Sequence, residues 1–166
     1  DKFPSKVATP FQYLLMNWNP MGHPPPHVYA KPHFDVHFYM NPNEERLAIK
    51  PGPCEVLVSC EDHKKGMKPL KPKYVPKDYS YTEAIEPGMG NHMMDMTGDE
   101  FNGGEFTHSF IYGHFDGKMT FYEPMVTLKY FQEVASGTAP SKCFAMKLPK
   151  AWEVSGWYPT EYCMRY

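Results

Sequence analysis

The residues best suited to chemistry occur in one short segment, residues 33–39, where potential metal ligands alternate with apolar side chains. Because successive side chains of a β-strand point to opposite faces, this alternation predicts a strand with one polar and one apolar face. The polar face carries His33, Asp35, His37 and Tyr39, and the apolar face carries Phe34, Val36 and Phe38. Imidazole and carboxylate groups are ligands of zinc, copper, iron and manganese, so the polar face predicts a transition-metal site.

The spacing within this segment limits which side chains can share an ion. On a straight strand, residues four apart are about 13 Å from each other and residues two apart about 7 Å. A single site can therefore use His33 with Asp35, or Asp35 with His37, and it needs further ligands from other segments. We expect these from His92 and Glu123 first, and from His23 or His108 next. The predicted metal ligands are thus His33, Asp35, His37 and His92, the alternative being structural histidines bonded to backbone carbonyls or to Asp35.

A second kind of binding is indicated by composition, since the chain has 12 Tyr, 11 Phe, 3 Trp and 12 Met. Rings give broad contact area and thioethers adapt to shape, so such residues suit an irregular apolar pocket, although they also suit an ordinary core. An elongated ligand such as a carotenoid, a retinoid or a lipid fits this composition. The residues predicted to contact it are Trp18, Tyr29, Phe34, Phe38, Met93, Met96, Phe110, Tyr112 and Phe121.

Short strands joined by many turns must position these residues, because 18 Pro and 12 Gly interrupt the 166-residue chain. Strands are predicted at 11–18, 33–40, 55–59, 92–96, 106–112, 118–123, 143–148 and 157–166, and helices at 41–49 and 125–135. Residues 61–78, rich in Lys and Pro, are predicted to form an exposed loop. We therefore expect a mainly β protein with one or two short helices in a single domain over 1–166, either a barrel or a sandwich. The alternating faces favour an antiparallel barrel with a lined interior.

The four cysteines are even in number and lack C-x-x-C spacing, which disfavours zinc-ribbon and thioredoxin-like chemistry. They allow three disulfide pairings or four free thiols, and we favour Cys54 with Cys60 and Cys143 with Cys163. The sequence begins at Asp1 rather than Met, as a processed secreted protein would. We therefore expect secretion.

Charge and hydropathy argue against two classes of partner. The formal net charge is −2, from 17 basic and 19 acidic residues, so a basic surface for nucleic acid is not expected. Apolar runs in the chain are shorter than the roughly 18 residues that a membrane span needs.

Several segments together resemble a family of uncharacterised secreted domains, mostly bacterial, represented by a sigma-E-controlled hypothetical protein of a thermophile. They include residues 17–25 (NWNPMGHPP), 32–39 (PHFDVHFY), 44–46, 87–92 (PGMGNH), 106–113 (FTHSFIYG), 116–117 and 123–125. The resemblance implies a compact β-rich, barrel-like fold and a homo-oligomer, but it implies no activity. The chain departs from the family at Met93, where Trp is expected, and in its lysine-rich loop and four cysteines.

Two functions follow from these observations. The first is a secreted, non-enzymatic binding protein that carries an elongated hydrophobic molecule. The alternative is a His/Asp metal-binding protein or a cupin-like metalloenzyme. The cupin pattern of His-x-His with a Glu four to five residues later differs from the His-x-x-x-His found here, since Glu44 and Glu45 lie seven and eight residues after His37.

Overall fold

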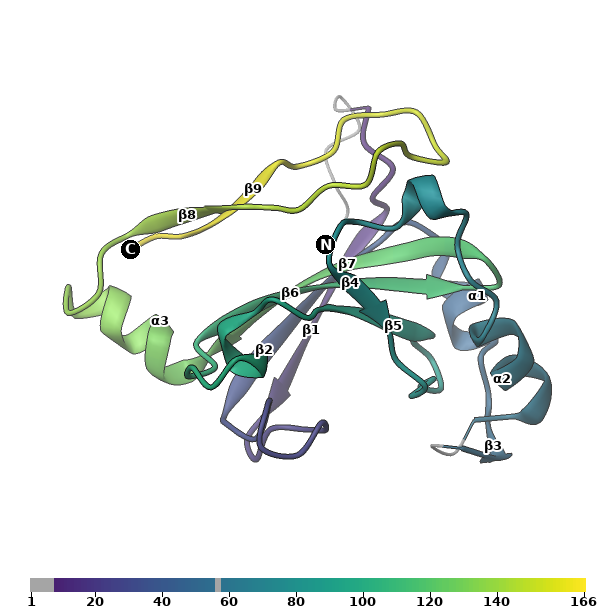
Figure 1. The fold of residues 1–166 in the computed structure, drawn as a ribbon, viewed down its shortest axis with the longest axis horizontal. Helices are drawn as coiled ribbons and strands as arrows, with labels where there is room; N and C mark the ends of the chain where they lie inside the picture. The colour runs from purple at the N-terminus through teal and green to yellow at the C-terminus, as the bar shows by residue number, and fades with distance from the viewer. Residues whose placement is uncertain (1–7, 56–57) are drawn as a thin grey trace.

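The computed structural model describes residues 8–55 and 58–166, and its centre is a six-stranded antiparallel sheet (Figure 1). The strand order is β1-β2-β7-β6-β5-β4. The bounds are β1 Tyr13–Asn19, β2 His33–Tyr39, β4 Tyr79–Tyr81, β5 Asn91–Asp95, β6 His108–Phe115 and β7 Lys118–Thr127. The mainly β prediction is confirmed, but the described strands form an open sheet rather than a closed barrel. Its two edge strands are β1 and the three-residue β4.

The longest strands, β6 and β7, form a hairpin closed at Asp116-Gly117, as the sequence predicts. Both turn residues have positive φ, 50° and 74°, which suits the tight turns that match the twist of paired strands. The next element differs from the prediction at its start, because β7 continues to Thr127 and helix α3 spans only Leu128–Ala135. Thr127 ends the strand and caps the helix, its hydroxyl accepting a bond from the Tyr130 amide.

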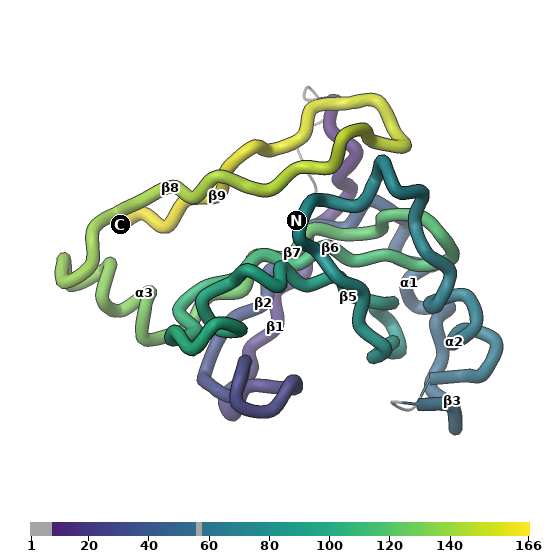
Figure 2. Tube along the Cα trace, viewed as in Figure 1, coloured from purple at the N-terminus to yellow at the C-terminus, as the bar shows by residue number. Residues whose placement is uncertain are grey.

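One face of the sheet packs against a two-stranded arm of β8 (Lys142–Ala145) and β9 (Glu161–Met164), which Figure 2 shows crossing over the sheet. A disulfide between Cys143 and Cys163 joins the two strands at paired positions. The cluster between sheet and arm is apolar and includes Phe11, Phe110, Tyr112, Tyr122 and Met146. Burial of this apolar area is a main stabilising contribution of the fold.

The lysine-rich segment 61–78 is more ordered than the sequence predicts. Helix α2 spans Cys60–Gly66, and a 3-10 turn follows at Pro72–Tyr74. Ser59 starts the helix by accepting a bond from the Asp62 amide, and the predicted Cys54–Cys60 disulfide ties its first residue to strand β3 (Pro51–Cys54). The prediction of an exposed loop is corrected there, because capping and a covalent tie outweigh the loop-like composition.

Two further elements lie near this helix. Helix α1 spans Asn43–Leu47, inside the predicted 41–49. The predicted strand at 55–59 falls partly on residues 56–57, which lie outside the described residues. Among the residues that the structure describes, no helix has the length and hydrophobicity to cross a membrane.

Candidate metal centre

The polar face of β2 is more deeply buried than its apolar face. Its four residues are His33, Asp35, His37 and Tyr39, with exposures of 0%, 5%, 0% and 0%, whereas Phe34, Val36 and Phe38 are half-buried. Burying imidazole and carboxylate groups is unfavourable unless they are hydrogen-bonded, paired or bound to a metal. The partners of these groups therefore indicate whether the polar face is a structural hydrogen-bonded seam or a metal site.

The side chains of this face divide into two clusters. One, the central cluster, joins His37 to His92 and Glu123, and the other, the loop cluster, joins His33 and Asp35 to His23. In each cluster, one potential ligand atom from each residue lies within 4.8 Å of the others. The sequence alone left open whether Asp35 would join His33 or His37. The structure places it with His33.

Three strands of the sheet, β2, β7 and β5, bring the central cluster together. Asp35 pairs with Met125 and Phe38 with Tyr122, and this register places His37 opposite Glu123 on β7. His92 reaches the same face from β5. The distance from His37 Nε2 to Glu123 Oε1 is 3.3 Å, and that from His92 Nε2 to Glu123 Oε2 is 3.8 Å. Because β5 and β2 are not neighbours in the sheet, this approach depends on the long-range strand order.

In the part of the chain that the structure describes, several buried polar atoms of the central cluster lack the hydrogen bonds that would offset the cost of their burial. Across residues 8–55 and 58–166, neither ring nitrogen of His37 has a hydrogen-bond partner, and Glu123 Oε2 has none. Burial, aided by the nearby His92, lowers the pKa of His37 to about 3. Burial also lowers the pKa of His92, and burial with the charges of Asp35 and Glu86 raises the pKa of Glu123 well above its usual value. At neutral pH both histidines are therefore neutral, which is the form that binds metals.

The Phe121 ring packs against both histidines of the central cluster. Its centroid lies 5.1 Å from that of His37 and 5.3 Å from that of His92. Gly113 on β6 makes room for this ring, because a Cβ at Gly113 would lie 2.0 Å from Phe121 Cε1. Here glycine is required by close approach rather than by an unusual backbone angle.

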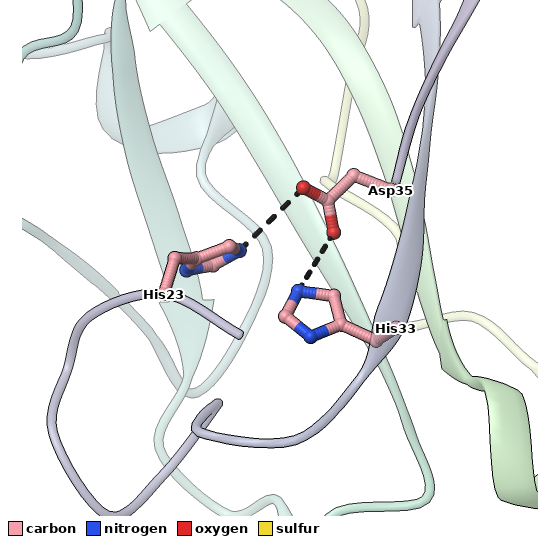
Figure 3. Close-up of side chains that lie close together, drawn as sticks. All are labelled: His23, His33 and Asp35. Carbon is pink, nitrogen blue, oxygen red and sulfur yellow. Dashed lines mark ion pairs between the residues drawn. The ribbon is translucent and has the colours of Figure 1, made fainter. Parts of the chain in front are cut away.

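In the loop cluster, two histidines approach different oxygens of one carboxylate (Figure 3). His33 Nε2 lies 3.0 Å from Asp35 Oδ1, and His23 Nε2 lies 3.5 Å from Asp35 Oδ2. Burial would raise the pKa of Asp35, but the two histidines outweigh it and hold that pKa far below its usual value. Burial likewise opposes charge on His23, yet the hydrogen bond to Asp35 leaves the pKa of His23 raised.

Both clusters border one cavity of about 610 Å³. Its lining includes His23 and Asp35 from the loop cluster, His92 and Glu123 from the central cluster, and Glu86. The fully buried His33 and His37 lie behind these residues. A metal at either cluster would thus have protein on one side and open space on the other.

The residues predicted to contact an apolar ligand are distributed over both faces. Phe38 and Phe110 line a second, apolar cavity of about 640 Å³ between the sheet and the arm. Met93 and Tyr112 are fully buried in the core of that side, and Trp18 packs on Phe34 near the sheet edge. Tyr29 and Phe121 belong to the opposite, polar face, while Met96 is 43% exposed. The structure therefore brings together part of the predicted set.

Four positions show the limits of the sequence prediction. The sequence ranks Glu123 among the first further ligands and His23 among the next, but the approach of His23 depends on a turn and that of Glu123 on strand register. Asn19, which donates from Nδ2 to Asp35 Oδ2 at 2.7 Å, has no signal except its alternation with Asn17 in β1. His108 faces the arm, where its Nδ1 lies 2.8 Å from the Tyr162 hydroxyl, far from the role of a ligand.

A third group of potential ligands, Cys143, Cys163 and Glu161, is explained differently. The two sulfurs form a disulfide and cannot act as thiolate ligands. The two clusters on the polar face are therefore the candidate metal centres of the described chain.

The chain was compared with known proteins at three levels. It matches no protein-family model, and it matches no curated protein. No solved structure matches it either. The residues and their geometry are accordingly what bears on function.

Proposed function

We propose that the protein binds a divalent transition metal through His37, His92 and Glu123. One observation carries the proposal. Deep in the protein, two neutral imidazoles and one carboxyl converge, and His37 finds no hydrogen-bond partner for either nitrogen anywhere in the described chain. An unsatisfied buried polar group costs roughly 1–3 kcal/mol, and coordination to a cation would remove that cost for the His37 nitrogen that binds it.

The donor set supports particular metals. Two imidazoles and a carboxylate form three-residue sites for zinc and for non-haem iron, and they also suit copper and manganese. A site with three protein ligands keeps at least one coordination position for water or a small ligand. That position would face the cavity that His92 and Glu123 line. The proposed protein is a metal-binding protein whose ion can also receive a small polar molecule.

The test is the metal content of protein purified without chelator, followed by zinc titration of chelator-treated protein. We expect stoichiometric metal, and we expect His92→Ala to lower zinc binding by one equivalent. His27→Asn is the matched control, because His27 is an exposed histidine with positive φ, which Asn tolerates. Wild-type protein that neither carries metal nor takes up zinc would refute the proposal, as would full zinc binding by His92→Ala.

A second function, carriage of an elongated apolar ligand such as a carotenoid, a retinoid or a lipid, is favoured by the apolar cavity. That cavity is lined almost wholly by apolar groups from the sheet and the arm, including Val36, Phe38, Phe110, Met146 and Trp157. Ligand cavities of this size bury most of a small molecule and depend on apolar contact. Because this cavity lies between the sheet and the arm, it suits a long, narrow ligand.

Retinol is a suitable probe for this second function, because Trp157 lies in the lining and its fluorescence reports on binding. We expect retinol to quench tryptophan fluorescence saturably, and Val36→Trp to abolish binding by filling the cavity. Leu14→Trp, on the same face of the neighbouring strand but outside the lining, serves as control. Equal retinol binding by both variants would exclude this cavity as the carrier site.

The two disulfides support an extracellular location for either function. Disulfides form and persist in oxidising compartments and are rare in reducing ones. We therefore propose that the protein acts outside the cytosol.

A further inference from the structure

In the loop cluster, a hydrogen bond to a backbone carbonyl defines the tautomer of each histidine, whereas neither ring nitrogen of His37 has such a partner within the described chain. His33 Nδ1 lies 2.6 Å from the Lys31 carbonyl oxygen, and His23 Nδ1 lies 2.7 Å from the Pro24 carbonyl oxygen. A carbonyl oxygen can only accept, so both Nδ1 atoms carry the proton and donate it. In the neutral rings, each Nε2 therefore has a free lone pair.

These lone pairs point at a carboxylate, which is also an acceptor. His33 Nε2 and His23 Nε2 approach the two oxygens of Asp35 at 3.0 and 3.5 Å (Figure 3). Three acceptor groups facing one another repel unless a donor, protons or a cation lies among them. The Asn19 amide supplies one donor, with Nδ2 2.7 Å from Asp35 Oδ2 and 3.5 Å from His33 Nε2. Satisfying both histidine–carboxylate contacts by protonation would need two protons between ring centroids 4.6 Å apart, beside the fully buried His33. One divalent cation satisfies all three groups at once.

The surroundings are those of a metal site. Ligand histidines usually donate the second ring N–H to a carbonyl or carboxylate, which orients the ring and raises its basicity. Both rings do so here. Asn19 further orients the carboxylate, because its Nδ2 donates to Asp35 Oδ2 at 2.7 Å.

Two backbone features, the spacing on strand β2 and a turn at Gly22, produce this arrangement. His33 and Asp35 are two residues apart on β2, and His23 is returned to them by the turn at Gly22. Gly22 has φ of 72°, and a Cβ there would lie 2.1 Å from the Tyr29 carbonyl oxygen. A residue with a side chain cannot make this turn, so the close approach of His23 depends on glycine.

We propose that His23, His33 and Asp35 form a second transition-metal site, separate from the central cluster and open to the same cavity. Asp35 and His37 lie two positions apart on an extended strand, about 7 Å, so the two sites are neighbours rather than one bridged centre. The ligand atoms are the Nε2 atoms of both histidines and the Asp35 carboxylate. This donor set suits Zn²⁺ and its neighbours in the first transition row. Because the side chain of His23 is 30% exposed, this site exchanges metal with solvent more readily than the buried central cluster.

The experiment is zinc stoichiometry, measured by titration of chelator-treated full-length protein, with cobalt absorption as a second readout. Wild-type protein is expected to bind two equivalents, His23→Ala one, His92→Ala one, and the double variant none. Asp35→Asn, of nearly equal size, is expected to bind one equivalent and decides the matter if His23→Ala is misfolded by circular dichroism. His27→Asn is the control and is expected to retain two.

The outcomes separate this site from the central one. Two equivalents in His23→Ala and Asp35→Asn would overturn the second site. One equivalent in wild-type protein that His23→Ala keeps and His92→Ala loses would overturn it and leave the central site standing. One equivalent that His23→Ala loses and His92→Ala keeps would support the second site and refute the central one. Absence of zinc binding in wild-type protein would overturn both.

Discussion

Glu123 holds a carboxyl in the protein interior next to two imidazoles. Its pKa is raised by burial and by the charges of Asp35 and Glu86, so in the metal-free protein this side chain is favoured in its neutral form. A cation would reverse that preference by supplying the missing positive charge. In the proposed site, Glu123 thus links the stability of the metal-free protein to the binding of a metal.

Glu123→Gln tests this connection. Gln keeps the size and neutrality of the protonated acid, so the free energy of unfolding of the metal-free protein is expected to change by less than about 1 kcal/mol. Zinc should then stabilise the variant much less than wild-type protein, because stabilisation by a ligand follows its affinity. Thermal unfolding with and without zinc measures both quantities.

Glu86→Gln is the matched control for this experiment, since Glu86 lines the same cavity but is not part of either cluster. It should retain the full gain in Tm with zinc. An equal loss of that gain in both variants would mean that general negative charge, and not coordination by Glu123, attracts the ion.

His114 gives a prediction about pH that is independent of metal. It is 1% exposed, and within the described part of the chain both of its ring nitrogens lack hydrogen-bond partners. Burial, with a smaller contribution from His92, lowers its pKa to about 4. The unfolded chain therefore binds a proton near pH 6.5 that the folded protein excludes until about pH 4. Neutral His114 makes its full contribution to the free energy of unfolding above pH 6.5, and this contribution decreases as the pH falls toward 4.

His114→Leu should remove this dependence. Between pH 7 and pH 4, the free energy of unfolding of wild-type protein relative to the variant is expected to fall by roughly 3 kcal/mol. Urea unfolding of the metal-free proteins at pH 7, 5.5 and 4 provides the comparison. A constant difference across this range would show that His114 titrates alike in the folded and unfolded states.

At the scale of elements, the contact between β6 and β7 controls the central cluster through Phe121. Gly113→Ala would place a methyl group within the Phe121 ring, so the ring must move away from His37 and His92. We expect a loss of roughly 1–3 kcal/mol in stability from overpacking, together with weaker zinc binding at the central cluster. Unfolding and zinc titration of the same preparation test both expectations.

Gly103→Asn is a suitable control, because no described atom outside the adjacent chain lies within 4 Å of a Cβ there and Asn tolerates its φ of 83°. It should leave both quantities near the wild-type values. Unchanged zinc binding in Gly113→Ala would indicate that Phe121 packs beside the histidines without positioning them.

The elements also show how far the sequence could predict this site. The two-residue period of residues 33–39 was sufficient to predict strand β2 and its polar face, because alternation of polar and apolar residues is a local property of the sequence. The division of that face into two clusters was not predictable, since it depends on β5 and β7 reaching it through long-range register. The approach of His23 to Asp35 depends on the turn at Gly22. Helix α2 was not predicted, because its lysines resemble those of a solvated loop. Local pattern thus predicted which residues of β2 share the polar face, and long-range pairing determined their partners.

For the whole molecule, the arm is held by its own disulfide. The Cys143–Cys163 bond closes a separation of 20 residues and the Cys54–Cys60 bond one of six, so chain entropy predicts contributions of about 3 and about 2 kcal/mol. Replacing both Cys143 and Cys163 by Ser should therefore destabilise the protein more than the same change at Cys54 and Cys60. Urea unfolding under non-reducing conditions compares the two double variants.

The same pair of variants tests the cavity beneath the arm. Loss of Cys143–Cys163 should weaken retinol binding, whereas loss of Cys54–Cys60, on the other side of the molecule, should not. Equal retinol affinity in both variants would place the ligand elsewhere.

Strand β2 is shared by the two cavities, since its odd-numbered residues face the central and loop clusters and its even-numbered residues Val36 and Phe38 face the apolar cavity. One backbone thus forms the wall between them. A molecule bound on either side would restrict the motions of that wall, and thermodynamic linkage makes such an influence mutual. The affinity for metal and the affinity for an apolar molecule would then change together and by the same factor, so that β2 would be a mechanical connection between two chemically unlike ligands.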